Sequence, residues 1–143
     1  MFGKFLFCLS FVLILGCGFP LVLSQQDETP VDEATLQRGL EVYHSYYCGL
    51  CHASKAAGTE GIFGPSHDDL VTVAQERISS PDYTGTAQTV AAYLRESTLE
   101  PERYVVPGFE LSRHRMPAFT HMSEEELDSL IYFLLHQQEV EMP

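Results

Sequence analysis

The sequence predicts an all-α chain with about four helices joined by long loops, and three observations support this class. Ser123-Glu124-Glu125-Glu126 forms a capping box, and apolar residues follow it at helical spacing as far as position 135. Residues 56–65 contain three glycines and a proline, and the segment after Pro101 has prolines at positions 107 and 117, both typical of loops. No alternation of apolar and polar residues predicts a strand.

The other helices are predicted in chain order. Thr29 is expected to cap the first helix, with Pro30 at its first position, and the helix should run into the cysteine pair of the domain. Its apolar residues at helical spacing are Leu36, Leu40 and Tyr43. A short helix is expected over residues 69–77, and a longer one over 86–99, which ends before Pro101.

Length and charge narrow the classes of function. A chain of 143 residues is sufficient for one domain, and an apolar share of 45% favours a globular one. The sequence has 8 Lys and Arg against 20 Asp and Glu, which gives a formal net charge of -12. Nucleic acids are excluded as partners, because binding them requires clustered basic residues along one face.

The first 24 residues have the features of a signal peptide. Lys4 precedes an apolar run, and Val22 and Ser24 are small residues before a cleavage point, so the chain is expected to be exported to the periplasm or the outer face of the cytoplasmic membrane. Two other fates stay open: a lipobox that ends at Cys17, with lipid on that thiol, or retention of residues 5–23 as a membrane anchor. Residues 25–31 are interpreted as a polar tether, and residues 32–143 as the domain.

The motif with the clearest chemistry is Cys48-Gly49-Leu50-Cys51-His52, because C-x-x-C-H is the attachment signature of c-type haem. Each thiol can add to one vinyl group of the porphyrin, and the adjoining imidazole then binds the iron. A thioredoxin-like thiol pair would normally follow a strand in a βαβ unit, and a zinc site would need further ligands of similar spacing. The sequence therefore predicts one covalently attached haem c, with Cys48, Cys51 and His52 as its residues.

The second axial ligand is predicted to be Met116. A thioether on the iron opposite a histidine favours the ferrous state and suits electron transfer. Met116 stands before Pro117 in a long loop, whereas Met122 precedes the capping serine and is interpreted as a hydrophobic staple, and Met142 is one residue from the end. The remaining histidines are expected at the surface: His44, His67, His114, His121 and His136. Of these, His114 and His121 are the alternatives to Met116 as the second ligand.

These residues resemble a class I monohaem cytochrome c from about Asp32 to Gln137. The resemblance implies the cytochrome c fold around one covalent haem, with C-x-x-C-H after a first helix, Gly64-Pro65, Met116-Pro117 and a final amphipathic helix. It implies that the Pro65 carbonyl accepts a hydrogen bond from Nδ1 of His52. It also implies that the first and last helices cross through four residues: Gly39, Tyr43, Leu130 and Phe133.

Residues 93–101 and 104–109, followed by Met116-Pro117, are similar to cytochrome c domains of respiratory oxidases and to the monohaem subunit of quinol-oxidising alternative complex III. The resemblance implies an electron carrier in a respiratory or photosynthetic chain. It would not itself be an enzyme, and its partners would be redox proteins or a membrane respiratory complex. Membrane attachment would use the Cys17 lipid or the N-terminal segment. The alternative function is a haem protein with a labile methionine that binds ligands or reacts with peroxide.

Two features depart from the family pattern. The interval from residue 56 to 90 is long, and there is no tryptophan to contact a haem propionate. That contact is therefore expected from an arginine or from Tyr83, Tyr93 or Tyr104. Arg113 and Arg115 form a basic spot beside Met116, and they are expected to neutralise propionates, to guide a redox partner, or to form surface pairs with carboxylates.

Overall fold

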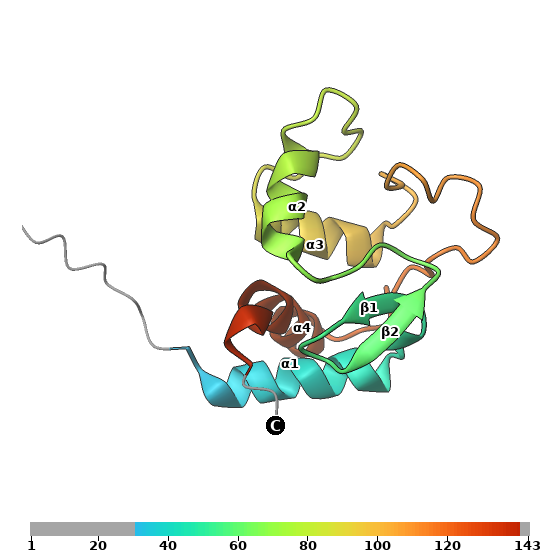
Figure 1. Ribbon diagram of the computed structural model, residues 1–143. Helices are drawn as coiled ribbons and strands as arrows, with labels where there is room; N and C mark the ends of the chain where they lie inside the picture. Colours follow the sequence, from blue (N-terminus) through green and yellow to red (C-terminus); the bar gives the residue numbers. More distant parts are fainter. Residues whose placement is uncertain (1–30, 141–143) are drawn as a thin grey trace, which may run out of the picture.

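A computed structural model describes residues 31–140 of the chain. Along the chain it contains α1 (Glu33–Ser45), a 3-10 turn η1 (Cys48–Leu50), β1 (His52–Ser54), β2 (Thr59–Ile62), α2 (Leu70–Ile78), α3 (Val90–Leu99), α4 (Glu124–His136) and a second 3-10 turn η2 (Gln137–Glu139) (Figure 1). The predicted signal peptide of residues 1–24, the lipid site at Cys17, most of the tether and Met142 lie outside the described residues.

The all-α prediction is wrong, because β1 and β2 pair as a small antiparallel sheet. Ala53 lies opposite Glu60 and Ser54 opposite Thr59, with an irregularity next to His52. The turn between the strands includes Gly58 at φ 62, a left-handed conformation that glycine adopts without strain. The strands have three and four residues, too few for an alternating pattern to be recognised. The glycines of residues 56–65 therefore predicted only a loop.

The first helix begins later than predicted. Asp32 is its N-cap, and its carboxylate accepts hydrogen bonds from the Ala34 amide at 3.2 Å and the Thr35 hydroxyl at 2.5 Å. The sequence predicted the cap at Thr29, but aspartate satisfies the free amides of a first turn at least as well as threonine. The helix ends at Ser45, and Tyr47, in a left-handed conformation, redirects the chain into η1.

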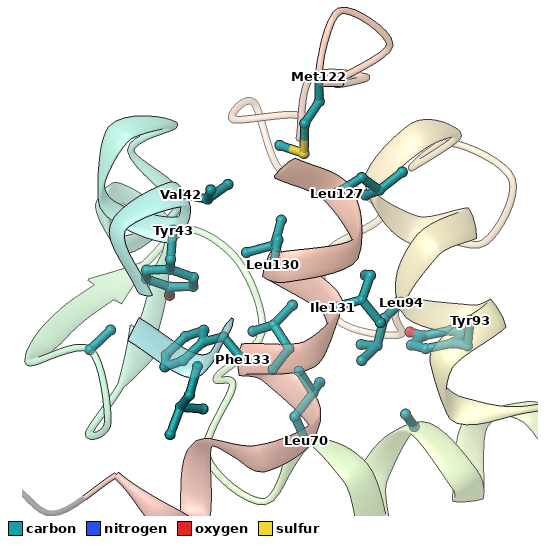
Figure 2. Close-up of a cluster of buried hydrophobic side chains, with 14 residues drawn as sticks. Val42, Tyr43, Leu70, Tyr93, Leu94, Met122, Leu127, Leu130, Ile131 and Phe133 are labelled. Atoms are coloured by element: carbon teal, nitrogen blue, oxygen red, sulfur yellow. The ribbon is translucent and has the colours of Figure 1, made fainter. Parts of the chain in front are cut away.

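The last helix has the predicted cap. The Ser123 hydroxyl accepts from the Glu126 amide at 3.2 Å, and the Glu126 carboxylate accepts from the Ser123 amide at 2.8 Å, which confirms the capping box. Met122, directly before the cap, is buried in the same core as Leu127 one turn into the helix (Figure 2). The interpretation of Met122 as a hydrophobic staple is confirmed.

Helices α1 and α4 make the most extensive contact of any two elements. A Cβ atom added to Gly39 would lie 2.1 Å from the Ser129 carbonyl oxygen and 2.5 Å from Cβ of Phe133. Tyr43 meets Phe133 edge to face, with ring centroids 5.5 Å apart, and Leu130 is buried beside them (Figure 2). The expected crossing of the first and last helices through these residues is therefore present.

Helices α2 and α3 pack against α4 on the side away from α1 (Figure 1). From α2, Leu70 and Ala74 enter the core, and from α3, Tyr93 and Leu94. The predicted bounds of α2 are correct to one residue, whereas α3 begins only after Thr89, whose side chain caps it. Within residues 31–140, no helix combines the length and apolar character needed to cross a membrane.

We predict that Gly39→Ala destabilises the protein by about 1–3 kcal/mol, because the added methyl group overlaps the α4 backbone and the helices must separate. The measurement is urea unfolding of the full chain. Gln37→Ala, at an exposed position of the same helix, is the control and should change the free energy of unfolding by less than about 0.5 kcal/mol. Equal stability of the two variants would contradict the close helix crossing.

Candidate functional site

A mainly apolar cavity of about 350 Å³ opens between the end of α1, η1 and β1 and the helices α2, α3 and α4, together with the long loop after α3. All five residues that the sequence analysis assigned to the cofactor line this cavity: Cys48, Cys51, His52, Pro65 and Met116. They come from three segments up to 68 positions apart in the chain. The fold thus brings the predicted site residues to one place.

The C-x-x-C-H motif is held by close backbone packing. Cys48 lies in η1, Cys51 ends it, and His52 begins β1. Strand β2 packs against η1 at two glycines: a Cβ on Gly49 would lie 2.3 Å from Cγ2 of Thr59, and one on Gly61 would lie 2.5 Å from the Cys51 carbonyl carbon. The hairpin that the sequence did not predict therefore supports the motif from behind.

His52 is 7% exposed, and its ring is oriented by a hydrogen bond. Its Nδ1 lies 2.7 Å from the Pro65 carbonyl oxygen, the contact that the family resemblance implied. A carbonyl oxygen can only accept, so Nδ1 carries the proton and Nε2 keeps its lone pair. Burial lowers the pKa of His52, and the charge of Arg77 acts in the same direction, while the Pro65 hydrogen bond opposes them. The result is a neutral imidazole of defined tautomer.

Gly64 allows this geometry. A Cβ at that position would lie 2.5 Å from Cε1 and 2.8 Å from Nδ1 of His52, inside the space that the ring occupies. The Gly64 amide also donates to the Cys51 carbonyl at 2.9 Å. The backbone of Gly64 and Pro65 therefore supports the His52 imidazole directly, because Gly64 places no side chain between the backbone and the ring.

The cysteines are free thiols, and their surroundings disfavour a thiol redox pair. Burial raises the pKa of Cys48 to about 11, so its thiol is protonated at neutral pH. Redox-active cysteines have lowered pKa values, because the thiolate is the reactive form. A zinc site is also unsupported, since no three His, Cys, Asp or Glu side chains gather in a metal-binding arrangement in the described part of the chain.

The candidates for the second iron ligand differ in position. Met116 lines the cavity and is half-buried, whereas Met122 is 8% exposed in the core and does not line it. His114 also lines the cavity, with its ring 4.1 Å from that of Phe63. His121 is exposed and does not line the cavity, although its ring lies 5.7 Å from that of Tyr46, which does. Met116 and His114 are thus the two predicted candidates that reach the site.

His67 was expected at the surface, and this expectation is wrong. Its ring lies parallel to that of His52, with centroids 4.1 Å apart and an interplanar angle of 16°. Burial lowers its pKa well below the usual value, helped by the proximity of His52 and Arg77. His67 lies in an irregular segment, where no periodicity indicates which side chains are buried, so no sequence signal could have placed it.

Arg77 was also missed, although the spacing of α2 contained a signal. Leu70, Ala74 and Arg77 stand at i, i+4 and i+7, so the arginine shares the helix face that packs inward. Its guanidinium donates to the Tyr93 hydroxyl at 3.2 Å, and Arg77, Tyr93 and Tyr104 all line the cavity. No carboxylate lies within ion-pair distance of Arg77 among residues 31–140.

The basic spot beside Met116 is only partly at the cavity. Arg115 lines it but pairs with Glu102 at 3.3 Å, with both side chains about half exposed. Arg113 is exposed and does not line the cavity. Of the three roles expected for these arginines, Arg115 therefore fits that of a surface ion pair with a carboxylate. Tyr83 does not line the cavity either. Its hydroxyl donates a hydrogen bond to Glu96 at 2.5 Å.

Comparison with models of protein families, with curated proteins and with solved structures found no match to this chain.

Proposed function

We propose that this chain is a monohaem c-type cytochrome that transfers electrons. The supporting observation is the meeting, in one apolar cavity, of the Cys48 and Cys51 thiols, a neutral His52 whose Nδ1 is held by Pro65, and Met116. The proposed role is that of an electron carrier and not of an enzyme, because a haem held by two protein ligands passes electrons without transforming a substrate.

The residues fit a covalent haem. The cavity is apolar and of a volume within the range of about 300–1,000 Å³ typical of small-molecule and cofactor sites. Its donor set combines a neutral imidazole with a thioether, the ligand pair found in electron-transfer cytochromes. The two thiols are free for thioether bonds. When bound, the haem would supply an iron that cycles between Fe(II) and Fe(III).

Each residue then has a distinct task. His52 would bind the iron through Nε2, and the Pro65 carbonyl keeps that nitrogen basic by accepting from Nδ1. Met116 would supply the second ligand through its thioether sulfur and favour the ferrous state. Leu130 and Leu134 from α4, together with Leu70, form an apolar wall that excludes water. Excluding water keeps the rearrangement of surroundings small when the iron changes charge.

Arg77, Tyr93 and Tyr104 would receive the carboxylates of the cofactor. The Tyr93 oxygen accepts from Arg77, so its own proton remains free to donate to an anion. An arginine in contact with a carboxylate makes a strong charge-assisted hydrogen bond. These three residues take the place of the absent tryptophan.

We further propose, from residues 1–24 and the resemblance, that the chain is exported and works in a respiratory or photosynthetic chain with a redox protein or a membrane complex as partner. Export would bring the chain to the compartment where c-type haem is attached. The choice among cleavage after Ser24, lipid on Cys17 and a retained anchor is testable by mass spectrometry of the N-terminus of the purified native protein.

The first test is haem attachment. The full chain, expressed with export and haem attachment machinery, should keep haem through denaturing electrophoresis, whereas a variant with Cys48→Ser and Cys51→Ser should lose it, because both thioether bonds are absent. Haem staining of the gel is the measurement, and Ser45→Ala is the control at a nearby position. A wild-type chain without haem, but with a thiol pair that cycles with dithiol reagents, would instead support the redox-pair interpretation.

The second test concerns Met116. Methionine on ferric haem iron gives a weak charge-transfer absorption band at long wavelength, and Met116→Ala should abolish it and lower the reduction potential. Met122→Leu, a change in the core, should keep the band. Survival of the band in Met116→Ala would contradict the assignment. A wild type that lacks the band and binds carbon monoxide or peroxide readily would favour the ligand-binding alternative.

The third test concerns Arg77. Its positive charge favours the ferrous iron, so Arg77→Gln should lower the reduction potential by tens of millivolts, on the order expected for one lost charge at an effective dielectric constant of about 20. Arg77→Lys should retain most of the potential. Arg38→Gln, which removes an exposed charge paired with Glu125, is the control and should give a much smaller shift. Equal shifts for Arg77→Gln and Arg38→Gln would exclude a local role for Arg77.

A further inference from the structure

His67 and His52 form a stacked pair of imidazoles inside the cavity. The rings are 4.1 Å apart between centroids and within 16° of parallel. Offset stacking of planar rings at this separation is attractive and holds two rings in a common orientation. The plane of His52 is therefore in contact with a second plane that comes from another segment of the chain.

The backbone of His67 is fixed on both sides. Its amide donates to the Ala53 carbonyl in β1 at 2.8 Å, and its carbonyl accepts from Nε2 of Gln137 at 2.8 Å. Gln137 is itself buried at the end of α4 and accepts from the Ser54 hydroxyl. The ring of Tyr43 meets that of His67 edge to face at 5.8 Å. His67 is thus a rigid support, tied to β1, α4 and α1.

The choice of histidine at position 67 is unfavourable for stability alone. Its Nδ1 atom is buried and has no hydrogen-bond partner among the described residues. A buried polar atom without a partner costs free energy that an apolar side chain of similar volume would not. One property that histidine has and leucine lacks is a flat ring, and the contact with His52 uses that ring.

We propose that His67 is a positioning residue that sets the rotation of the His52 imidazole. The hydrogen bond from Nδ1 to Pro65 fixes one atom of the ring but leaves the ring free to turn about that contact. The stack supplies the second constraint, because it opposes any tilt of the His52 plane. This inference rests on the proposed function, in which His52 binds the iron.

The rotation of the imidazole has a consequence that can be measured. An imidazole donates π electron density to iron along the normal of its own plane. With haem bound, the direction of that plane would therefore help to set how the unpaired spin of the ferric state spreads over the four pyrroles. His67 is expected to control this pattern without touching the iron.

The experiment compares His67→Leu with His67→Phe in the haem-loaded full chain. Both variants remove the unpartnered Nδ1, so both should be at least as resistant to urea as the wild type. The phenylalanine variant keeps a flat ring that can stack on His52, whereas the leucine variant does not. The readouts are the order and spread of the haem methyl shifts in the NMR spectrum of the ferric protein, and its EPR g values.

We expect the leucine variant to change the methyl shift pattern and the phenylalanine variant to keep it. His121→Leu, which removes a ring outside the cavity, should leave the pattern unchanged. If the leucine variant does not fold, His67→Met replaces it, because methionine also lacks a ring. If the leucine or methionine variant binds haem and shows the same methyl shift pattern as the wild type, the inference about His67 is wrong, but the proposed function stands. A wild-type chain without covalent haem would overturn the proposed function as well.

Discussion

The place of the cavity depends on how closely α1 and α4 approach each other. At Gly39 the two helices touch without an intervening side chain, so Tyr43 reaches Phe133 and α1 keeps a fixed position on α4. The Tyr43 hydroxyl then donates to the His52 carbonyl at 3.4 Å, and the chain that leaves α1 enters η1 beside it. The crossing therefore determines where the C-x-x-C-H motif faces the apolar side of α4.

His52 is held by contacts from several separate parts of the chain, and none of them alone would be sufficient. Pro65 fixes one ring nitrogen, Gly64 leaves room for the ring, and His67 lies flat against it. Each contact limits a different movement: rotation that would exchange the nitrogens, displacement away from the backbone, and tilt of the plane. A side chain so constrained loses little further freedom when it binds a ligand, which favours binding because the ordering is already complete.

The sequence predicted the parts of the structure that have strong local causes. Helix α4 follows from a capping box and an apolar stripe, and the three predicted haem residues of C-x-x-C-H follow from a short motif whose chemistry links its members. The hairpin was missed because its strands are short and are stabilised by packing against η1 and not by their own pattern. His67 was missed for the same kind of reason, since its backbone is held by a hydrogen bond from Gln137, 70 positions away. Arg77 had a local signal in the spacing of α2, but only tertiary structure shows which side chains share its cavity.

The distribution of charge distinguishes Arg77 from the other cations. The chain is strongly acidic, and most described Lys and Arg side chains contact a carboxylate: Arg38, Lys55, Arg95, Arg103 and Arg115. Arg113 is exposed, where water solvates its charge. Arg77 instead lines an apolar cavity, with a tyrosine hydroxyl as its hydrogen-bond partner. A cation in such surroundings is costly unless an anion joins it. With so many carboxylates in the chain and none placed beside Arg77 in its described part, the anion is best supplied by what enters the cavity.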